Sequence, residues 1–375
     1  IYSTVRPEQE HFGIIENTID NLIVSTGFTT LDIIDDTIDA KYFYYSLTNK
    51  SITEYLNVIA SNNVTSYPSL NPSDIGDLVL KIPSSKIEQQ KIAKVLSDLD
   101  AKIEINNRIN AELEAMAKTL YDYWFVQFDF PAANGKPYKT AGGKMVWNEE
   151  LKRDIPEGWI NGELKDIANI TTGKLDSNAE VPNGNYPFYT CASEPTKTDS
   201  FAFDDAVILI AGNNAAGNFH INRYKGKFNA YQRTYITTAK NITDLEYLYQ
   251  VLKTETKLLK SQGKGSQTKF LTIGMLTGIK IFKGNSRIMK SFNDMTNPMF
   301  EQQIVVRKQN QELASLRDWL LPMLMNGQVS VGDFEDENIT EKKKQILKTI
   351  EKFNVYSVNG ADLGKVAEGN SKYEN

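Results

Sequence analysis

Cysteine and histidine are nearly missing from this sequence. Its 375 residues contain one cysteine, Cys191, and two histidines, His11 and His220. A single thiol excludes a disulfide framework and is typical of a reducing compartment. These three side chains are also too few to build the usual zinc sites. We therefore expect a cytoplasmic protein that binds no metal of its own.

Long apolar runs and nucleotide-binding loops are lacking as well. No apolar run approaches the ~20 residues of a membrane-spanning helix, so we expect no membrane contact. The glycine-bearing segments 142–145 and 263–266 lack the spacing and the Lys-Ser/Thr pair of a P-loop. The nuclease-like pair Glu163 and Lys165 has no acidic partner at the required place. The sequence thus predicts neither ATP hydrolysis nor DNA cleavage by this chain.

One tetrapeptide is similar to a methyltransferase motif. The segment 297–300 reads Asn-Pro-Met-Phe and resembles the Asn-Pro-Pro-aromatic motif of amino-methyltransferases. Met299 departs from that motif, and no glycine-rich cofactor loop lies nearby. We interpret the segment as the start of a helix and expect no methyl transfer by this chain.

The net charge is only −5, but the charges are distributed unevenly. Residues 206–243 and 256–293 contain no Asp or Glu. The first window carries Arg223, Lys225, Lys227, Arg233 and Lys240, and the second carries Lys257, Lys260, Lys264, Lys269, Lys280, Lys283, Arg287 and Lys290. Such windows indicate contact with nucleic-acid phosphates, with a merely solvated face as the alternative.

The longest regular pattern covers residues 85–125, which contain neither Gly nor Pro. Apolar positions alternate at four and three residues, the spacing of a left-handed coiled coil. This seam consists of Ile92, Leu96, Leu99, Ile103, Asn106, Asn110, Leu113, Ala117, Leu120 and Trp124. The pattern predicts one unbroken helix that requires a partner helix, with Ser84 or Ser85 as its N-cap.

Shorter elements are predicted elsewhere in the chain. Residues 21–31 alternate like a strand with a turn at Gly27, and residues 41–60 look helical. Residues 206–210 and 227–238 are typical of buried strands, and residues 340–353 of a basic helix.

A second stretch, 286–325, resembles the first at a shift of about 200 residues. Asn110, Glu112, Leu113 and Leu120 recur there as Asn310, Glu312, Leu313 and Leu320. Upstream, the aromatic segment 42–47 has a counterpart in 247–252. We therefore predict an α+β protein that contains two repeated α/β domains. Two long antiparallel helices separate them and form a coiled coil with pseudo-twofold symmetry. Asn110 and Asn310 occupy equivalent places in it, either buried, where they would fix the register, or exposed at a frayed seam.

The residues of these helices resemble those of a known family. Segment 88–93 (EQQKIA) after Pro83, together with Trp124-Phe125, resembles the central conserved region of type I restriction-modification specificity (S) subunits. Segment 316–322 (LRDWLLP) is similar to the distal conserved region of that family. Segments 3–7 (STVRP) and 25–28 (STGF) resemble parts of its first target-recognition domain, and segment 155–159 (IPEGW) resembles the start of its second.

The resemblance implies a division of the chain into five segments. They are 1–83, the C-terminal part of a first target-recognition domain; 84–130, the central conserved helix; 131–283, a second target-recognition domain; 284–328, the distal conserved helix; and 329–375, a tail. If the second copy starts near Ile155, the first lacks roughly 50 residues at its front, so we expect an N-terminally truncated form.

The same resemblance implies a non-catalytic subunit that reads DNA. Each recognition domain would read one half of a bipartite double-stranded DNA site, and the helix pair would set the spacer. The helices would also bind two modification subunits, which methylate adenine with S-adenosylmethionine. In the family, restriction subunits that use ATP and Mg²⁺ can join this complex. We expect no cofactor in this chain.

Contact residues in the second domain are predicted from side-chain chemistry. Amides suit adenine edges, Arg suits guanine, and Lys, Arg and Tyr suit phosphates. The base-reading candidates are Asn213, Asn214, Asn218, Gln232 and Arg233, and the phosphate candidates are Arg223, Lys225, Lys227, Tyr231, Lys264 and Lys269. In the first domain the candidates are Arg6, Ser25 and Thr26.

Two other classes of protein remain open from the sequence. A coiled-coil scaffold would bind only protein partners and would have no salt-sensitive DNA affinity. A fused methyltransferase-nuclease would need a cofactor loop and an intact Asn-Pro-Pro-aromatic motif. Loss of DNA binding on neutralising the lysines and arginines of 223–227 would separate the DNA-reading protein from the scaffold.

Overall fold

The structure is a computed structural model, and it describes residues 1–16, 20–62, 68–214, 217–262 and 269–332. The chain forms two compact units. Unit 1 comprises Ile1–Leu99 and the chain from Leu316 onward, and unit 2 comprises Asp100–Ser315. The helix predicted at 340–353 and nearly all of the tail lie outside the described residues. Within the described ranges, no helix is long and apolar enough to cross a membrane.

Unit 1 is built mainly from short elements. They are β1 (Tyr2–Ser3), η1 (Pro7–Gln9), β2 (Phe28–Thr29), α1 (Ala40–Leu47), α2 (Lys50–Asn62) and α3 (Pro72–Gly76). The strand expected over 21–31 is reduced to β2, and the helix expected over 41–60 is interrupted at Thr48 and Asn49. Strand β1 pairs with β2, so two segments some 25 residues apart lie side by side.

Unit 1 has two small apolar cores. Tyr42 and Tyr45 of α1 pack with Ile92 and Leu96 of the long helix and with Leu321 near the other end of the chain. The second core joins α2 to the β1–β2 pair and is formed by Tyr2, Leu47, Leu56, Ala60, Leu70 and Ile75. The buried Gln89 amide donates to the carbonyls of Thr37 and Pro83 at 3.1 and 2.8 Å, which fixes the start of the long helix to α1.

Both predicted long helices are present. Helix α4 spans Lys86–Tyr121 and continues into a π-helical turn, η2 (Asp122–Val126), and α8 spans Ser286–Met325. The Ser85 side chain accepts from the Glu88 amide, as predicted for an N-cap. The interpretation of 297–300 as a helix start is wrong, because Pro298 lies in the interior of α8.

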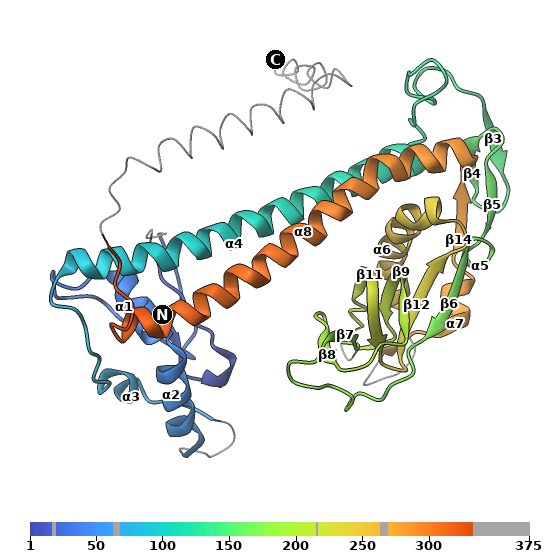
Figure 1. Cartoon of the computed structure of the whole chain (residues 1–375). Helices are drawn as coiled ribbons and strands as arrows, with labels where there is room; N and C mark the ends of the chain where they lie inside the picture. Colours follow the sequence, from blue (N-terminus) through green and yellow to red (C-terminus); the bar gives the residue numbers. More distant parts are fainter. Residues whose placement is uncertain (17–19, 63–67, 215–216, 263–268, 333–375) are drawn as a thin grey trace. The chain divides into compact units, whose positions relative to one another are not determined.

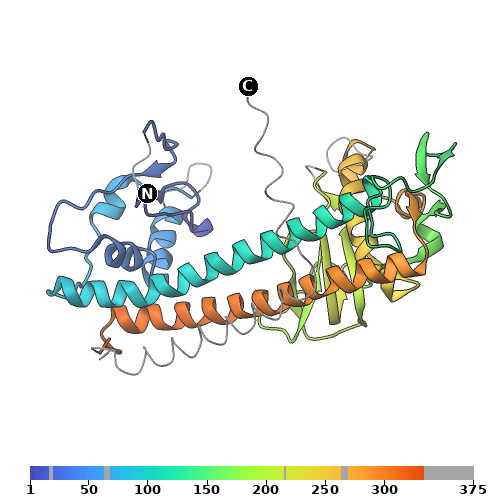
Figure 2. The ribbon, with the colours of Figure 1, turned by 90° about the horizontal axis from the view of Figure 1, so that it is seen from above.

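Within unit 2, α4 and α8 run antiparallel (Figures 1 and 2). The Asn106 amide donates to Asn310 Oδ1 at 2.8 Å, and Gln303 Nε2 donates to the Asn110 carbonyl at 3.1 Å. Every predicted seam position of α4 is buried or half-buried, whereas Ile105 and Met116 are exposed. The seam prediction therefore identified the buried side of α4. Asn310 contacts Asn106 and Asn107 of α4, and Asn110 contacts Gln303 of α8, so each Asn meets the opposite helix.

The globular part of unit 2 contains a six-stranded sheet with the order β6-β12-β9-β11-β7-β8. Its strands are β6 (Ala168–Thr172), β7 (Tyr186–Tyr189), β8 (Thr196–Thr198), β9 (Phe203–Ala211), β11 (Ile221–Ala230) and β12 (Thr234–Ala239). All neighbours are antiparallel except β7 and β11. The strands predicted at 206–210 and 227–238 are confirmed, although Tyr231–Arg233 form a turn between β11 and β12.

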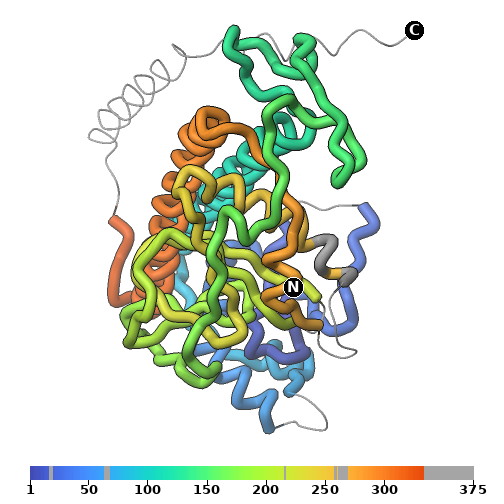
Figure 3. Tube along the Cα trace, turned by 90° about the vertical axis from the view of Figure 1, so that its right-hand side faces the viewer, coloured from blue at the N-terminus to red at the C-terminus, as the bar shows by residue number. Residues whose placement is uncertain are grey.

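The remaining elements of unit 2 surround this sheet. They are β3 (Met145–Asn148), β4 (Arg153–Pro156), β5 (Ile160–Glu163), α5 (Leu164–Ile167), β10 (Asn213–Asn214), η3 (Ile242–Asp244), α6 (Leu245–Gln262), β13 (Lys269–Phe270), α7 (Ile273–Thr277) and β14 (Lys280–Lys283). Strands β3 and β4 form a hairpin in the connector after α4, far from β8 in both views (Figures 1 and 3). Helix α6 lies between the sheet and the helix pair (Figure 1).

Aromatic side chains form the centre of the unit 2 core. Phe125 stacks on Tyr121, lies edge-on to Phe292 with ring centroids 5.0 Å apart, and contacts Tyr247 of α6 at 4.7 Å. Tyr121, Phe125 and Tyr247 are all buried. Large buried rings dominate the apolar area that a core removes from water. This cluster therefore joins the ends of both long helices to α6 and makes unit 2 one cooperative body.

Candidate nucleic-acid interface

Five loops meet at one edge of the unit 2 sheet, and we call them the loop cluster. They are 173–176, 189–193, 211–220 without its two undescribed residues, 230–234 and 269–271. The amides of Lys174 and Leu175 donate to the Ala230 carbonyl, so the first and fourth strands of the sheet order approach each other. The sheet is therefore curled, and this curl gathers loops that are far apart in the sequence.

Backbone hydrogen bonds hold the loop cluster together. The Gly212 amide donates to the Arg233 carbonyl, and the Leu271 amide donates to the Gly212 carbonyl, both at 2.8 Å. A Cβ atom at Gly212 would collide with that Arg233 carbonyl, so only glycine fits there. The Tyr231 amide donates to the Tyr189 carbonyl at 2.9 Å. The loops are consequently ordered supports for the side chains that they carry.

Gln232 and Arg233 project from the turn between β11 and β12. Both side chains are exposed, and Gln232 Nε2 donates to Asp176 Oδ1 at 2.8 Å. The Arg233 guanidinium has no hydrogen-bond or ion-pair partner among the described residues, while its carbonyl is bonded to Gly212. A fixed backbone with an uncommitted guanidinium suits contact with a guanine edge or a phosphate.

The asparagine-rich loop lies beside this turn. Asn214 pairs with Lys269 through the β10–β13 ladder, and its side chain accepts from the Asn218 amide at 3.1 Å. Lys260 Nζ donates to Asn218 Oδ1 at 2.8 Å, and Lys269 Nζ donates to the Lys260 carbonyl. The side-chain oxygen of Asn213 is buried and accepts no hydrogen bond from a described residue. Three predicted amides and one predicted lysine are thus together, whereas Lys264 lies outside the described residues.

Arg223 is buried, although it was predicted to contact phosphates on the surface. Its side chain is 4% exposed, forms an ion pair with the equally buried Glu246, and donates from Nη2 to Asn297 Oδ1 at 3.2 Å. The guanidinium carbon lies 3.5 Å from the centre of the Phe300 ring. Burial lowers the pKa of Arg223 to about 9, so the guanidinium is charged at neutral pH. A side chain enclosed in this way cannot contact a phosphate on the surface, and the prediction of Arg223 as a phosphate partner is wrong.

The other basic residues of β11 remain on the surface. Lys225 pairs with Glu301 of α8 at 2.9 Å, with side chains 57% and 43% exposed. Lys227 Nζ lies 4.6 Å from the centre of the Phe201 ring. Both residues are outside the loop cluster, whereas Tyr231 lies within it and is half-buried. Phosphate contact by Lys225, Lys227 and Tyr231 stays a prediction.

The candidates of the first domain are neighbours in unit 1. The Thr4 amide and hydroxyl both donate to the Gly27 carbonyl, at 2.8 and 3.0 Å. This contact places the exposed Arg6 on a segment next to that of the exposed Ser25 and Thr26. Two short segments with matching family resemblance therefore lie together, and the exposed basic residue among these candidates is Arg6.

Sequence reasoning missed two side chains of the loop cluster. Lys174 and Asp176 are exposed and follow β6 directly. The signal was Gly173 immediately after the β-branched residues Ile170, Thr171 and Thr172, because a glycine at the end of a strand permits close backbone contact. A Cβ atom at Gly173 would collide with the Ala230 carbonyl.

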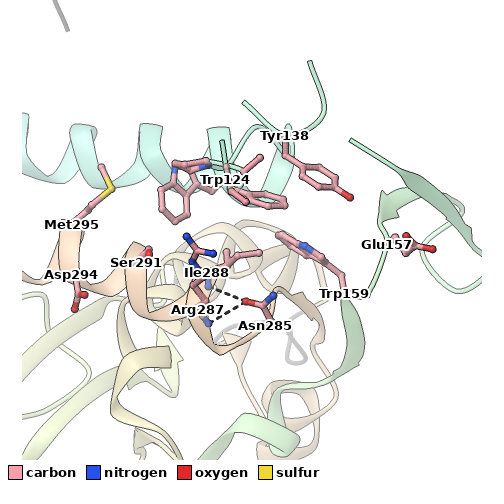
Figure 4. A pocket seen from close by; sticks show the side chains of 15 residues that line it. Trp124, Tyr138, Glu157, Trp159, Asn285, Arg287, Ile288, Ser291, Asp294 and Met295 are labelled. Carbon is pink, nitrogen blue, oxygen red and sulfur yellow. Dashed lines mark hydrogen bonds between the residues drawn. The ribbon is translucent and has the colours of Figure 1, made fainter. Parts of the chain in front are cut away.

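A separate pocket of about 620 Å³ lies where η2 and the connector approach the start of α8 (Figure 4). Trp124, Tyr138 and Trp159 line it together with Arg287. Asn285 Oδ1 accepts from the Arg287 and Ile288 amides at 3.1 and 3.2 Å, so it caps α8. None of the predicted contact residues that the structure describes lines this pocket, and the loop cluster remains the candidate interface.

The sequence matches a protein family described as the type I restriction modification DNA specificity domain. The match covers residues 1–115 and 156–282, and thus more than half of the chain. The chain belongs to this family. The two matched segments correspond to the two repeats predicted from the sequence, and membership favours a DNA-reading protein over a protein-only scaffold.

Two named relatives of this specificity family are similar over most of the chain, and a third is similar over about a third of it. The MjaIX specificity subunit of Methanocaldococcus jannaschii is 27% identical over 83% of this chain and 74% of its own length. The HindI specificity subunit of Haemophilus influenzae is 24% identical over 88% of this chain and 86% of its own length. The EcoDI specificity subunit of Escherichia coli is 41% identical over 34% of this chain and 28% of its own length.

One solved structure shares the fold. The S subunit of a type I restriction-modification system from M. genitalium matches with a TM-score of 0.50, covering 77% of this chain and 73% of that one. At 22% identity, this match supports the fold alone. The mixed helix and sheet architecture is therefore that of a solved S subunit.

Proposed function

We propose that this chain is the sequence-specific DNA-binding subunit of a type I restriction-modification complex and reads a bipartite site. The observation that carries the proposal is the occurrence of two specificity-domain segments in one chain. Two repeated readers match two half-sites, as the two subunits of a dimeric reader match a palindrome.

The loop cluster is the proposed reading surface of the second domain. Asn213, Asn214, Asn218, Gln232 and Arg233 would approach base edges, while Lys174, Lys260 and Lys269 would neutralise phosphates. Amides pair with adenine edges, and an Arg pairs bidentately with guanine, at roughly 1–3 kcal/mol of discrimination per good pair. In the first domain, Arg6, Ser25 and Thr26 would have the corresponding role.

Partner subunits would supply the chemistry. The chain would dock two modification subunits that hold S-adenosylmethionine and methylate adenine, and restriction subunits that use ATP and Mg²⁺. It would itself remain non-catalytic and free of cofactors. Helices α4 and α8 expose Ile105, Ile109, Met116 and Val305, which would provide apolar area for docking modification subunits.

The test is co-expression of the chain with its modification subunit, followed by single-molecule sequencing of host DNA for methyladenine. We expect one discontinuous motif with a modified adenine in each half. An Arg233→Ala variant should relax or abolish one half of that motif. The matched control is Arg287→Ala, an exposed arginine of the same unit outside the loop cluster.

The outcomes separate the hypotheses. A complex without any methylated motif would refute DNA reading by this chain. Failure to bind a modification subunit would favour the protein-only scaffold. An unaltered motif in Arg233→Ala would keep the function but remove the loop cluster from the reading surface.

A further inference from the structure

The contact between strand β11 and helix α8 is more specific than core packing requires. Arg223 inserts between Glu246 of α6 and the pair Asn297 and Phe300 of α8, and we call these three residues the Arg223 socket. The ion pair belongs to the globular domain, while the hydrogen bond and the ring contact belong to the long helix. One side chain therefore joins the domain to the helix.

A second contact runs parallel to the first. Lys225 forms an ion pair with Glu301. On strand β11, Lys225 lies two residues after Arg223, and on helix α8, Glu301 lies four residues after Asn297. Two residues along a strand span roughly 6.6 Å, and four residues along a helix span roughly 6 Å. The spacings agree, so β11 is aligned along α8 in one defined register.

A third contact anchors α6. Glu114 of α4 pairs with Lys253 at 2.6 Å and accepts from Tyr249 Oη and from Gln303 Nε2, both at 3.4 Å. Burial, followed by the nearby Glu114, raises the pKa of Tyr249, so its hydroxyl stays protonated and acts as the donor. This cluster ties α6 to both long helices on the side of the sheet where the Arg223 socket lies.

Buried polar contacts constrain geometry more strongly than apolar packing does. Apolar surfaces tolerate sliding, whereas an ion pair or hydrogen bond taken out of water becomes costly when it is displaced. A slip of one helical turn would move the domain by about 5.4 Å, more than the roughly 3.4 Å between successive base pairs. The register along α8 thus matters on the scale of one base pair.

We propose that Arg223 is a positioning residue whose socket fixes the register of the second recognition domain on α8, and thereby the spacer accepted between the two half-sites. This inference rests on the proposed function of the chain. Helix length sets the coarse spacing, and the Arg223 socket sets the fine spacing. Segment 297–300 (Asn-Pro-Met-Phe) thus supplies Asn297 and Phe300, which bind Arg223 of the same chain.

The main variant removes the directional contacts without leaving a buried charge. In Arg223→Met/Glu246→Leu, both partners of the ion pair become apolar, a change that often leaves stability unchanged or raises it. The matched control is Lys283→Met/Asp244→Leu, which removes another ion pair of the same unit with a buried carboxylate, between residues outside the Arg223 socket. Thermal unfolding of both proteins checks that they fold.

The readout is spacer preference. The motif is first taken from methylation by the unaltered complex, and duplexes are then made with the native spacer and with one base pair more or less. We expect the main variant to lose at least about fivefold of the preference for the native spacer while it retains both half-site sequences. The control should keep the preference of the unaltered complex.

A second variant guards against misfolding of the first. Asn297→Leu leaves the Arg223–Glu246 ion pair in place and removes only the acceptor on α8, so we expect a smaller loss in the same direction. If folded variants keep the native spacer preference, or if the control loses it equally, the inference is overturned. Absence of any bipartite motif in the unaltered complex would instead overturn the proposed function.

Discussion

The loop cluster and the Arg223 socket are two polar regions of the same unit with opposite environments. In the loop cluster, backbone hydrogen bonds fix the chain while side chains such as Gln232 and Arg233 stay exposed. In the socket, the side chains bond one another and are buried. Exposed polar groups are available to a ligand, whereas buried groups that contact one another determine how the protein is assembled.

Two arginines of similar sequence context illustrate the difference. Arg223 and Arg233 lie in the same acid-free window, and both were candidates for DNA contact. The structure encloses Arg223 and leaves Arg233 exposed. We therefore expect substitutions in the socket to change stability and those in the loop cluster to change DNA affinity.

The largest expected effect is that of Arg223→Ala. It leaves the Glu246 carboxylate buried without its partner and also removes the contact with Phe300, so we expect a loss of about 3–5 kcal/mol in the free energy of unfolding of unit 2. Urea titration followed by tryptophan fluorescence would measure it, because Trp124 and Trp159 belong to the core of this unit. Arg233→Ala is the control and should stay within about 0.5 kcal/mol of the unaltered chain. Equal stabilities of the two variants would contradict the comparison.

The polar contact between α4 and α8 is the next buried group whose removal should change stability. Asn106 is 1% exposed and donates to Asn310. Asn106→Ala removes this donor and leaves the Asn310 oxygen without it, so we expect a loss of about 1–3 kcal/mol. The neighbouring Asn107→Ala, which removes an exposed acceptor of Asn310, should cost less. The same urea titration compares them, and an inverted order would mean that the seam is hydrated rather than closed.

On the exposed side, Arg233→Ala should weaken DNA binding without altering stability. Loss of one good base contact corresponds to about 1–3 kcal/mol, or roughly 5–150-fold in affinity, at one position of the half-site. Lys269→Ala should weaken binding to all sequences alike and lower the salt dependence by about one phosphate contact. Titrations with single-base variants of the site would distinguish these patterns. A uniform loss in Arg233→Ala would reassign that residue to phosphate contact.

The sequence was most informative where the structure depends on local periodicity. The seam from Ile92 to Trp124 repeats every three or four residues, so it identified α4 and its buried side without knowledge of the partner. The continuous apolar run at 206–210 likewise identified the buried part of β9. The alternation over 21–31 was misleading, because only Phe28–Thr29 pair with another strand. Alternation in the sequence alone does not show that a segment pairs with another strand.

The sequence could not separate Arg223 from Lys225. Both are basic residues of one strand, two positions apart, and such residues point to the same face. What distinguishes them is contact with side chains more than 70 positions away, since Asn297 and Phe300 enclose only Arg223. The residue types of the loop cluster could be predicted from the sequence. Their position in the fold could not, because the curl of the sheet decides which loops meet.

The smallest expected effect is that of Lys225→Gln, which tests the rim of the socket. Its ion pair with Glu301 is about half exposed, so solvent screens it and the expected loss of stability is about 0.5 kcal/mol or less. If Lys225 only aligns β11 on α8, DNA affinity and its salt dependence should be unchanged in the variant. A decrease in the salt dependence would show that the lysine leaves Glu301 for a phosphate when DNA binds. Lys225 would then belong to the exposed region, and Arg223 alone would mark the boundary between the side chains that assemble the unit and those that read DNA.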